Sequence, residues 1–193
     1  MILEYADKDL RGYLSENFKN LQLVDKFRMA EEIAQGLLFL HAKNIVHCDL
    51  NSKNVLVHNK QIKITDFGMS RQINEVSIPS CSEVKCMPAY IDPRCLKDSK
   101  YDKKSDIYSL GVILWEISSG QPPFKLLTSY EIFWNIQVLD EFREIPAANT
   151  PLQYVELYKK CWDKDPRIRP EMPLIIKTLN ELQFQIHLSI SNL

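Results

Sequence analysis

The sequence contains no apolar run approaching the roughly 20 residues needed to cross a bilayer, and its first residues lack the charged start and small-residue cleavage site of a signal peptide. Its five cysteines form no Cys-x-x-Cys pair and have no histidine at zinc-ligand spacing. This argues against both a zinc site and a disulfide framework. These absences predict a soluble cytoplasmic protein with reduced thiols.

An excess of charge of either sign is also missing. The 24 Lys and Arg residues nearly balance the 25 Asp and Glu residues, for a formal net charge of −1. We therefore expect neither nucleic acid nor a membrane as partner. Apolar residues make up 45% of the 193 residues and charged residues 25%, which is typical of one globular domain.

The apolar residues that are present follow helical spacing over much of the chain. Residues 25–41 repeat at intervals of three and four, as in an amphipathic helix laid on a core. Ser105 has the chemistry of a helix N-cap, and the helix after it is apolar on nearly every side, which predicts a buried position. Further helices are predicted around 129–139, 151–162 and 171–188.

Two short alternating segments, Val55-Leu56-Val57 and Ile62-Lys63-Ile64, predict a small β-hairpin, after which no more strands are expected. From Arg71 to Lys104 the sequence shows no sustained period, which predicts a long loop of regulatory importance. The predicted fold class is mainly α with a small β-hairpin.

Two polar segments flank this hairpin. The first reads His-Cys-Asp-Leu-Asn-Ser-Lys-Asn over residues 47–54, and the second is Asp66-Phe67-Gly68. Phosphoryl transfer needs positioned magnesium and a carboxylate beside the attacking hydroxyl. The alternative interpretation of Asp49 and Asp66 is that they cap turns or helices, as aspartates commonly do.

Together the two segments resemble the catalytic loop H-R-D-L-x-x-x-N and the D-F-G motif of protein kinases, in the right order and with a hairpin between them. The resemblance extends over essentially the whole chain. Residues 3–6 look like the hinge that binds adenine, residues 104–111 look like the buried helix whose Asp106 braces the catalytic loop, and residues 161–170 look like the late signature of tyrosine-kinase-like and tyrosine kinases. It implies a partial kinase domain over residues 1–187, the hinge plus the C-terminal lobe of a tyrosine-kinase-like member, and a tail over 188–193.

The resemblance also implies a role for each matching residue. Asp49 would accept or orient the proton of the substrate hydroxyl, Lys53 would approach the γ-phosphate, and Asn54 and Asp66 would hold Mg²⁺. The ATP site would further contain Leu3, Glu4, Ala6, Asp9 and Leu56. The implied partners are ATP with Mg²⁺ and a protein substrate.

Three departures from the family pattern modify this expectation. Nothing before Leu3 matches the Gly-rich loop or the strand lysine, so the N-terminal lobe is expected to be missing and the chain alone to be nearly inactive. Cys48 replaces the Arg of H-R-D, so phosphorylation at Ser77, Ser80 or Ser82 is expected to matter less. Arg94 stands where a Glu usually pairs with the arginine matched by Arg169, so either Asp92 compensates or this edge is looser.

The leading hypothesis is thus an ATP-dependent protein kinase, with the substrate hydroxyl left open between Ser/Thr and Tyr. The alternative is a non-catalytic scaffold that binds a protein through the face exposed where the N-terminal lobe is missing, around Leu3, Leu56 and Phe67. The presence of Asp49, Asn54 and Asp66 together favours the enzyme, and the missing lobe favours the scaffold.

Overall fold

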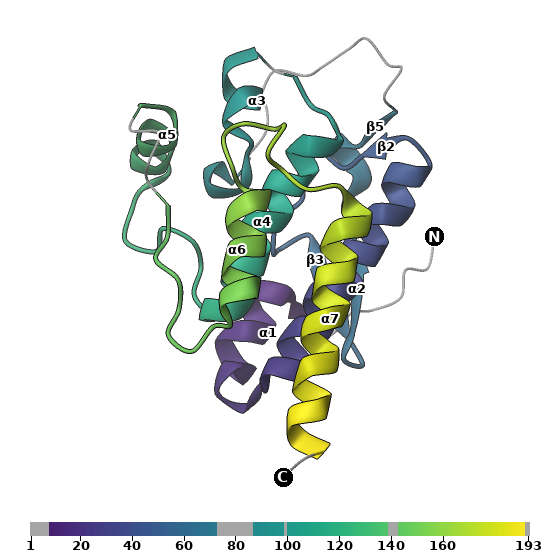
Figure 1. Cartoon of the computed structure of the whole chain (residues 1–193). Coiled ribbons are helices and arrows are strands. Elements are labelled where there is room, and N and C mark those ends of the chain that lie inside the picture. The colour runs from purple at the N-terminus through teal and green to yellow at the C-terminus, as the bar shows by residue number, and fades with distance from the viewer. Residues whose placement is uncertain (1–7, 73–86, 99, 139–142, 192–193) are drawn as a thin grey trace.

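The computed structural model of the chain describes residues 8–72, 87–98, 100–138 and 143–191. The predicted hinge residues Leu3, Glu4 and Ala6 lie outside this range, as do Ser77, Ser80 and Ser82. The described chain is mostly helical with two small sheets (Figure 1), which confirms the predicted fold class.

The core is built around α4 (Lys103–Ser119), in which every residue from Ser105 to Ser118 is buried. Helix α6 (Leu152–Cys161) packs along α4, and α7 (Met172–Ser191) packs along α2 (Leu23–Ala42), as Figure 1 shows. A Cβ atom at Gly111 would lie 2.8 Å from the Cβ of Cys161, so only glycine lets α4 and α6 approach this closely. The prediction that this helix lies in the middle of the core is confirmed.

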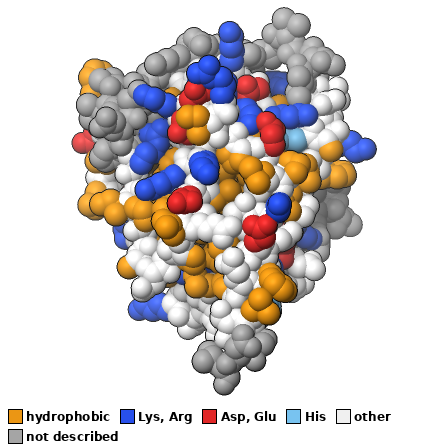
Figure 2. Space-filling view, viewed as in Figure 1, with side chains coloured by type: hydrophobic (Ala, Val, Ile, Leu, Met, Phe, Trp, Pro, Cys, Tyr) orange, Lys and Arg blue, Asp and Glu red, His pale blue; other side chains and the backbone are white. Residues whose placement is uncertain are grey.

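The remaining helices are α1 (Leu10–Asn17), α3 (Pro93–Asp98) and α5 (Ser129–Val138), with 3-10 turns η1 (Phe18–Asn20), η2 (Phe67–Met69) and η4 (Pro88–Tyr90). Helix α7 continues to Ser191, into the segment predicted as a tail. Figure 2 shows hydrophobic side chains scattered among basic and acidic ones on the face that carries α6 and α7. No helix in the described ranges is long and apolar enough to cross a lipid bilayer.

The predicted hairpin is confirmed as β3 (Val55–His58) and β4 (Gln61–Ile64), which pair antiparallel with Val55 opposite Ile64. The turn residues Asn59 and Lys60 both have positive φ, as a tight hairpin turn requires. Strand β1 (Lys8–Asp9) adds to the other edge of β3 and sets Asp9 opposite Leu56.

Several local predictions were wrong. Strands do not end at β4, because β5 (Arg71–Gln72) pairs with β2 (Ile45–Val46). The segment 71–104 is not all loop, since it contains η4 and α3. The N-cap of α4 is Asp102 rather than Ser105: the Asp102 carboxylate accepts from Ser105 N at 3.0 Å, and the Ser105 hydroxyl accepts from Asp102 N.

Candidate active site

The hairpin brings the two predicted motifs to one end of the small sheet. Segment 47–54 leads into β3, and Asp66 follows β4. Because Val55 pairs with Ile64, Asn54 and Thr65 meet just beyond that pair: Thr65 N donates to Asn54 O at 2.9 Å. Asn54 and Asp66 therefore lie at the same edge, because the hairpin between them brings its two ends together.

Asp49 is held in one orientation by two amides. The Nδ2 of Asn54 donates to the Asp49 carbonyl at 2.8 Å and to its Oδ2 at 2.9 Å. The Nδ2 of Asn51 donates to the same carbonyl at 3.0 Å and to Oδ1 at 3.2 Å. Both carboxylate oxygens thus have a donor, which fixes the rotamer that a general base needs.

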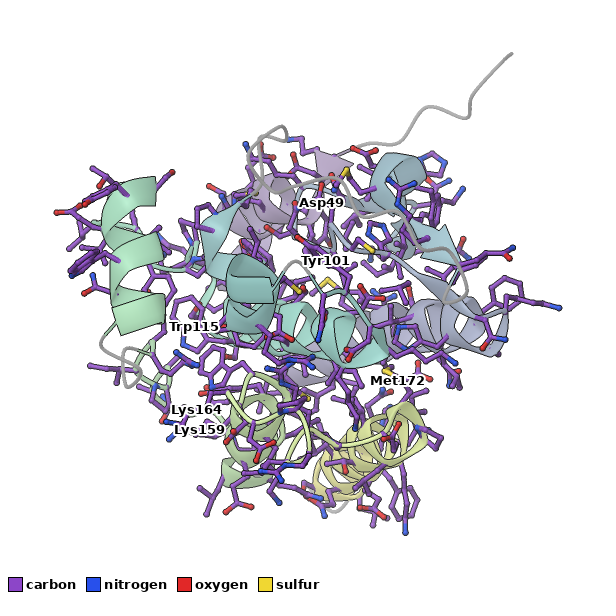
Figure 3. The ribbon with its side chains drawn as sticks, turned by 90° about the horizontal axis from the view of Figure 1, so that it is seen from above. Asp49, Tyr101, Trp115, Lys159, Lys164 and Met172 are labelled. Carbon is purple, nitrogen blue, oxygen red and sulfur yellow. The ribbon has the colours of Figure 1, made fainter. Side chains whose placement is uncertain are left out.

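Burial raises the pKa of the Asp49 carboxyl, against the lowering effect of the hydrogen bonds from Asn54 and Asn51. The negative charge of Asp66 raises the pKa of Asp49 further, so the two carboxylates interact. Figure 3 looks down on Asp49, which lies close to Tyr101, and these residues help to line a small cavity of about 10 Å³. That volume holds no more than about one water molecule.

A buried carboxylate of α4 fixes the start of the loop. Asp106 accepts from His47 N at 2.9 Å and from Cys48 N at 3.0 Å, and it lies 2.9 Å from His41 Nε2. Cys48 has a positive φ of 67°, an uncommon conformation for a side-chain-bearing residue that needs such support. Asp106 thus braces the loop in the way that the family resemblance implied.

His47 is structural. Its Nδ1 accepts from Asp49 N at 3.3 Å, its Nε2 lies 3.0 Å from Thr65 O, and its ring packs 5.3 Å from the ring of Phe67. It therefore ties the loop of residues 47–54 to the residue before Asp66. Asp66 itself has a left-handed backbone, with φ 62° and ψ 67°, and an exposed side chain.

Three more of the predicted site residues, Leu56, Asp9 and Lys53, lie in the described part of the chain. Leu56 is half-buried and lies opposite Asp9 in the sheet. Asp9 caps α1, since its Oδ1 accepts from Gly12 N at 2.7 Å. The capping interpretation that the sequence left open for Asp49 and Asp66 describes a contact of Asp66, whose Oδ1 accepts from Gly68 N at 3.4 Å at the start of η2. Lys53 is exposed, and its backbone N–H donates to Asn51 Oδ1 at 3.0 Å.

Sequence reasoning missed a buried network behind the loop. The carboxylate of Glu116, 1% exposed, accepts from Ser52 Oγ at 3.1 Å, from Arg11 Nε at 3.2 Å and from Tyr90 OH. Burial raises the pKa of Glu116 even against these hydrogen bonds. The available signal was a lone acidic residue inside the apolar run of α4. The network joins the loop of residues 47–54, α1 and η4.

The unusual Arg94 is accommodated by Asp92. Arg169, which is fully buried, donates from Nη1 and Nη2 to the two carboxylate oxygens of Asp92. Arg94 Nη2 donates to the same carboxylate at 2.7 Å and to Asp102 Oδ1 at 3.1 Å. Of the two alternatives left open by the sequence, the structure shows the first: Asp92 takes the place of the missing Glu as the partner of Arg169.

Compared with known proteins, residues 1–179 match the family described as protein tyrosine and serine/threonine kinase. The chain belongs to this family. It is 34% identical over 186 residues to dual specificity protein kinase shkD of Dictyostelium discoideum, and 33% identical over 181 residues to tyrosine-protein kinase Fer of Rattus norvegicus. It is 29% identical over 192 residues to serine/threonine/tyrosine-protein kinase HT1 of Arabidopsis thaliana.

These alignments cover 94%, 92% and 94% of the chain, respectively, but only 25%, 22% and 46% of the relatives. The chain therefore spans between about a fifth and a half of the length of these three relatives. Their names include tyrosine, dual specificity and mixed serine/threonine/tyrosine kinases, so they leave the acceptor hydroxyl open.

Proposed function

We propose that the chain is the hinge and C-terminal lobe of an ATP-dependent protein kinase of the tyrosine-kinase-like group, which transfers the γ-phosphoryl group of ATP to a protein hydroxyl. The observation that carries this proposal is Asp49, whose carboxylate is oriented by Asn54 and Asn51 beside the exposed carboxylate of Asp66. Membership of the kinase family supports it.

In this proposal Asp49 accepts or orients the proton of the attacking hydroxyl. Its raised pKa makes it a better proton acceptor than an ordinary aspartate. The two amides keep the carboxylate in place while the hydroxyl approaches, so little reorganisation is needed during transfer.

Asn54 and Asp66 would hold Mg²⁺. The described hydrogen bonds of the Asn54 side chain use its nitrogen, which leaves the amide oxygen for a cation. The Asp66 carboxylate is exposed at the same edge. Two protein oxygens suit Mg²⁺, which usually takes its other ligands from water and phosphate. When bound, the ion neutralises charge on the phosphates.

The adenosine of ATP would lie against Leu56, next to Asp9 across β1 and β3. Lys53, exposed beside Asn54, would reach the γ-phosphate. The proposed site also includes Leu3, Glu4 and Ala6, on the basis of the family resemblance alone. A cytoplasmic location stays a prediction.

The test is a phosphotransfer assay on the longest natural polypeptide that contains these residues, with Asp49→Asn as the variant. Asn preserves the shape but cannot accept the proton, so we expect kcat to fall about 100-fold or more with KM for ATP little changed. The control is Asp165→Asn, an aspartate paired with Arg167 at the surface. Full activity of Asp49→Asn would refute the proposal.

A second candidate is a scaffold that binds a protein partner. The observation in its favour is Phe67, a large apolar side chain that is 48% exposed. Replacing the gene in its source organism with the Asp49→Asn form separates the two functions. A scaffold keeps its biological role with this isosteric change, whereas a kinase loses it.

A further inference from the structure

A cavity of about 300 Å³ lies where the ends of several helices meet. Phe18 of η1 and the first turns of α2 form one side, and the C-terminal end of α4 forms another. Residues 147–150 and Tyr154 of α6 complete the wall. None of the residues proposed to bind nucleotide lines it.

The wall is partly aromatic and partly polar, since Phe18, Phe27 and Tyr154 share it with Ser118, Ser119, Asn149 and Thr150. Phe27 and Tyr154 are buried, and their rings stack with centroids 4.9 Å apart. Phe18, Leu23 and Ala147 extend this apolar surface. Such a surface favours the flat, apolar body of an organic molecule over water.

One cation lines this wall. Lys26 Nζ lies 3.6 Å from the centroid of the Phe18 ring, and no ion pair in the described part of the chain includes it. The neighbouring Asp25 is occupied elsewhere, since its Oδ2 accepts from Gln22 N at 3.1 Å. Burial lowers the pKa of Lys26. A partly dehydrated ammonium against a ring has room for an anionic partner.

The adjoining start of α2 adds to this preference. Lys26 and Leu23 both lie in the first turns of the helix, where the macrodipole leaves a partial positive charge. An anion bound at Lys26 would therefore meet favourable potential from the ammonium and from the helix end.

We propose that this cavity is a binding site for a small organic anion, a carboxylate attached to an aromatic body. Lys26 takes the carboxylate, and the apolar surface of Phe18, Leu23 and Ala147, backed by the buried stack of Phe27 and Tyr154, takes the ring. The volume equals that of about ten molecules of liquid water, at the small end of known ligand sites. The site is separate from the proposed kinase chemistry.

The experiment is isothermal titration of the 193-residue chain with 4-phenylbutyrate, compared with the uncharged 4-phenylbutan-1-ol. We expect the acid to bind with a dissociation constant on the order of 1 mM or lower. Lys26→Met keeps the apolar stem but removes the charge, and should weaken binding of the acid about five- to tenfold without changing binding of the alcohol. Lys177→Met, at an exposed lysine of α7, is the matched control and should bind as the unmodified chain does.

A second variant tests the location. Ala148 is exposed at the rim of the cavity, so Ala148→Trp should block entry without disturbing the core. Absence of binding by the unmodified chain, equal binding by Lys26→Met, or unchanged binding by Ala148→Trp would each overturn the proposal. The titration uses no ATP, so its outcome is independent of the phosphotransfer assay.

Discussion

Removing the carboxylate of Asp92 should be among the most damaging single changes in the described chain. The side chains of Asp92 and Arg169 are both fully buried. In Asp92→Ala, Arg169 keeps its hydrogen bonds to the carbonyls of Asp163, Lys104 and Lys164 but loses its counter-ion. Leaving a buried charge without its partner costs about 3–5 kcal/mol.

The matched control is Arg94→Ala, which removes the other arginine from the same carboxylate. Its side chain is 29% exposed, so water can replace part of what is lost and we expect about 1 kcal/mol or less. Urea unfolding measures both free energies, and an unchanged m value shows that the unfolded state is the same. For a chain of this size the larger loss corresponds to a fall in Tm of about 6–20 °C.

A double variant tests whether the loss in Asp92→Ala comes from the unpaired charge of Arg169. Asp92→Ala combined with Arg169→Leu removes both charges, and should be more stable than Asp92→Ala alone. The reasoning is refuted if Asp92→Ala costs no more than Arg94→Ala. It is also refuted if the loss in the double variant equals the sum of the losses in Asp92→Ala and Arg169→Leu.

The same pair predicts a pH dependence. Burial acts to raise the pKa of Asp92, but hydrogen bonds from Arg169 and Arg94 outweigh it, so the pKa lies below its ordinary value. The stabilisation is therefore complete above the unfolded pKa of about 4 and is lost as the pH falls through the folded value. Asp92→Ala should lose this acid-dependent part of the unfolding free energy.

Two sets of substitutions and one chemical modification have definite expected outcomes. Gly111→Ala would place its Cβ 2.8 Å from the facing helix, and should lower the free energy of unfolding in urea by about 1–3 kcal/mol. Any Cβ at position 120 meets the Phe18 ring, so both Gly120→Ala and Gly120→Asn should lower Tm. Gly120→Ala should lower it more, because the positive φ of 67° disfavours Ala more than Asn. Burial raises the pKa of Cys48 and of Cys95 to about 12, so mass spectrometry should detect little alkylation of either at pH 8 until the protein is unfolded.

The long helices were predictable because each buries one face, or all faces, over many turns. Helix α1 escaped prediction because only Leu10 and Leu14 are buried in it and Gly12 weakens its propensity. Strands β2 and β5 contain two residues each, too few to show any alternation. These elements form because tertiary contacts hold them, and a local pattern does not record such contacts.

The same distinction applies to the site. The spacing of Asp49, Asn54 and Asp66 is local, and the structure brings these three residues to one edge. The hydrogen bond between Ser52 and Glu116 spans 64 positions in the sequence, so no motif spacing reveals it. The sequence left open whether Asp92 pairs with Arg169 or this edge is looser, and only the three-dimensional distance decides between these alternatives.

Helix α4 explains how the loop of residues 47–54, which contains no helix or strand, is held in place. Asp106, near its start, holds the backbone of His47 and Cys48, and Glu116, near its end, holds Ser52. Ten residues of helix separate the two carboxylates by about 15 Å, so the loop is fixed at two distant points on one rigid buried rod. The cost of burying each acid is offset by several hydrogen bonds. Asp49 lies between these anchors, and its orientation therefore depends on the packing of the core as much as on its own amide donors.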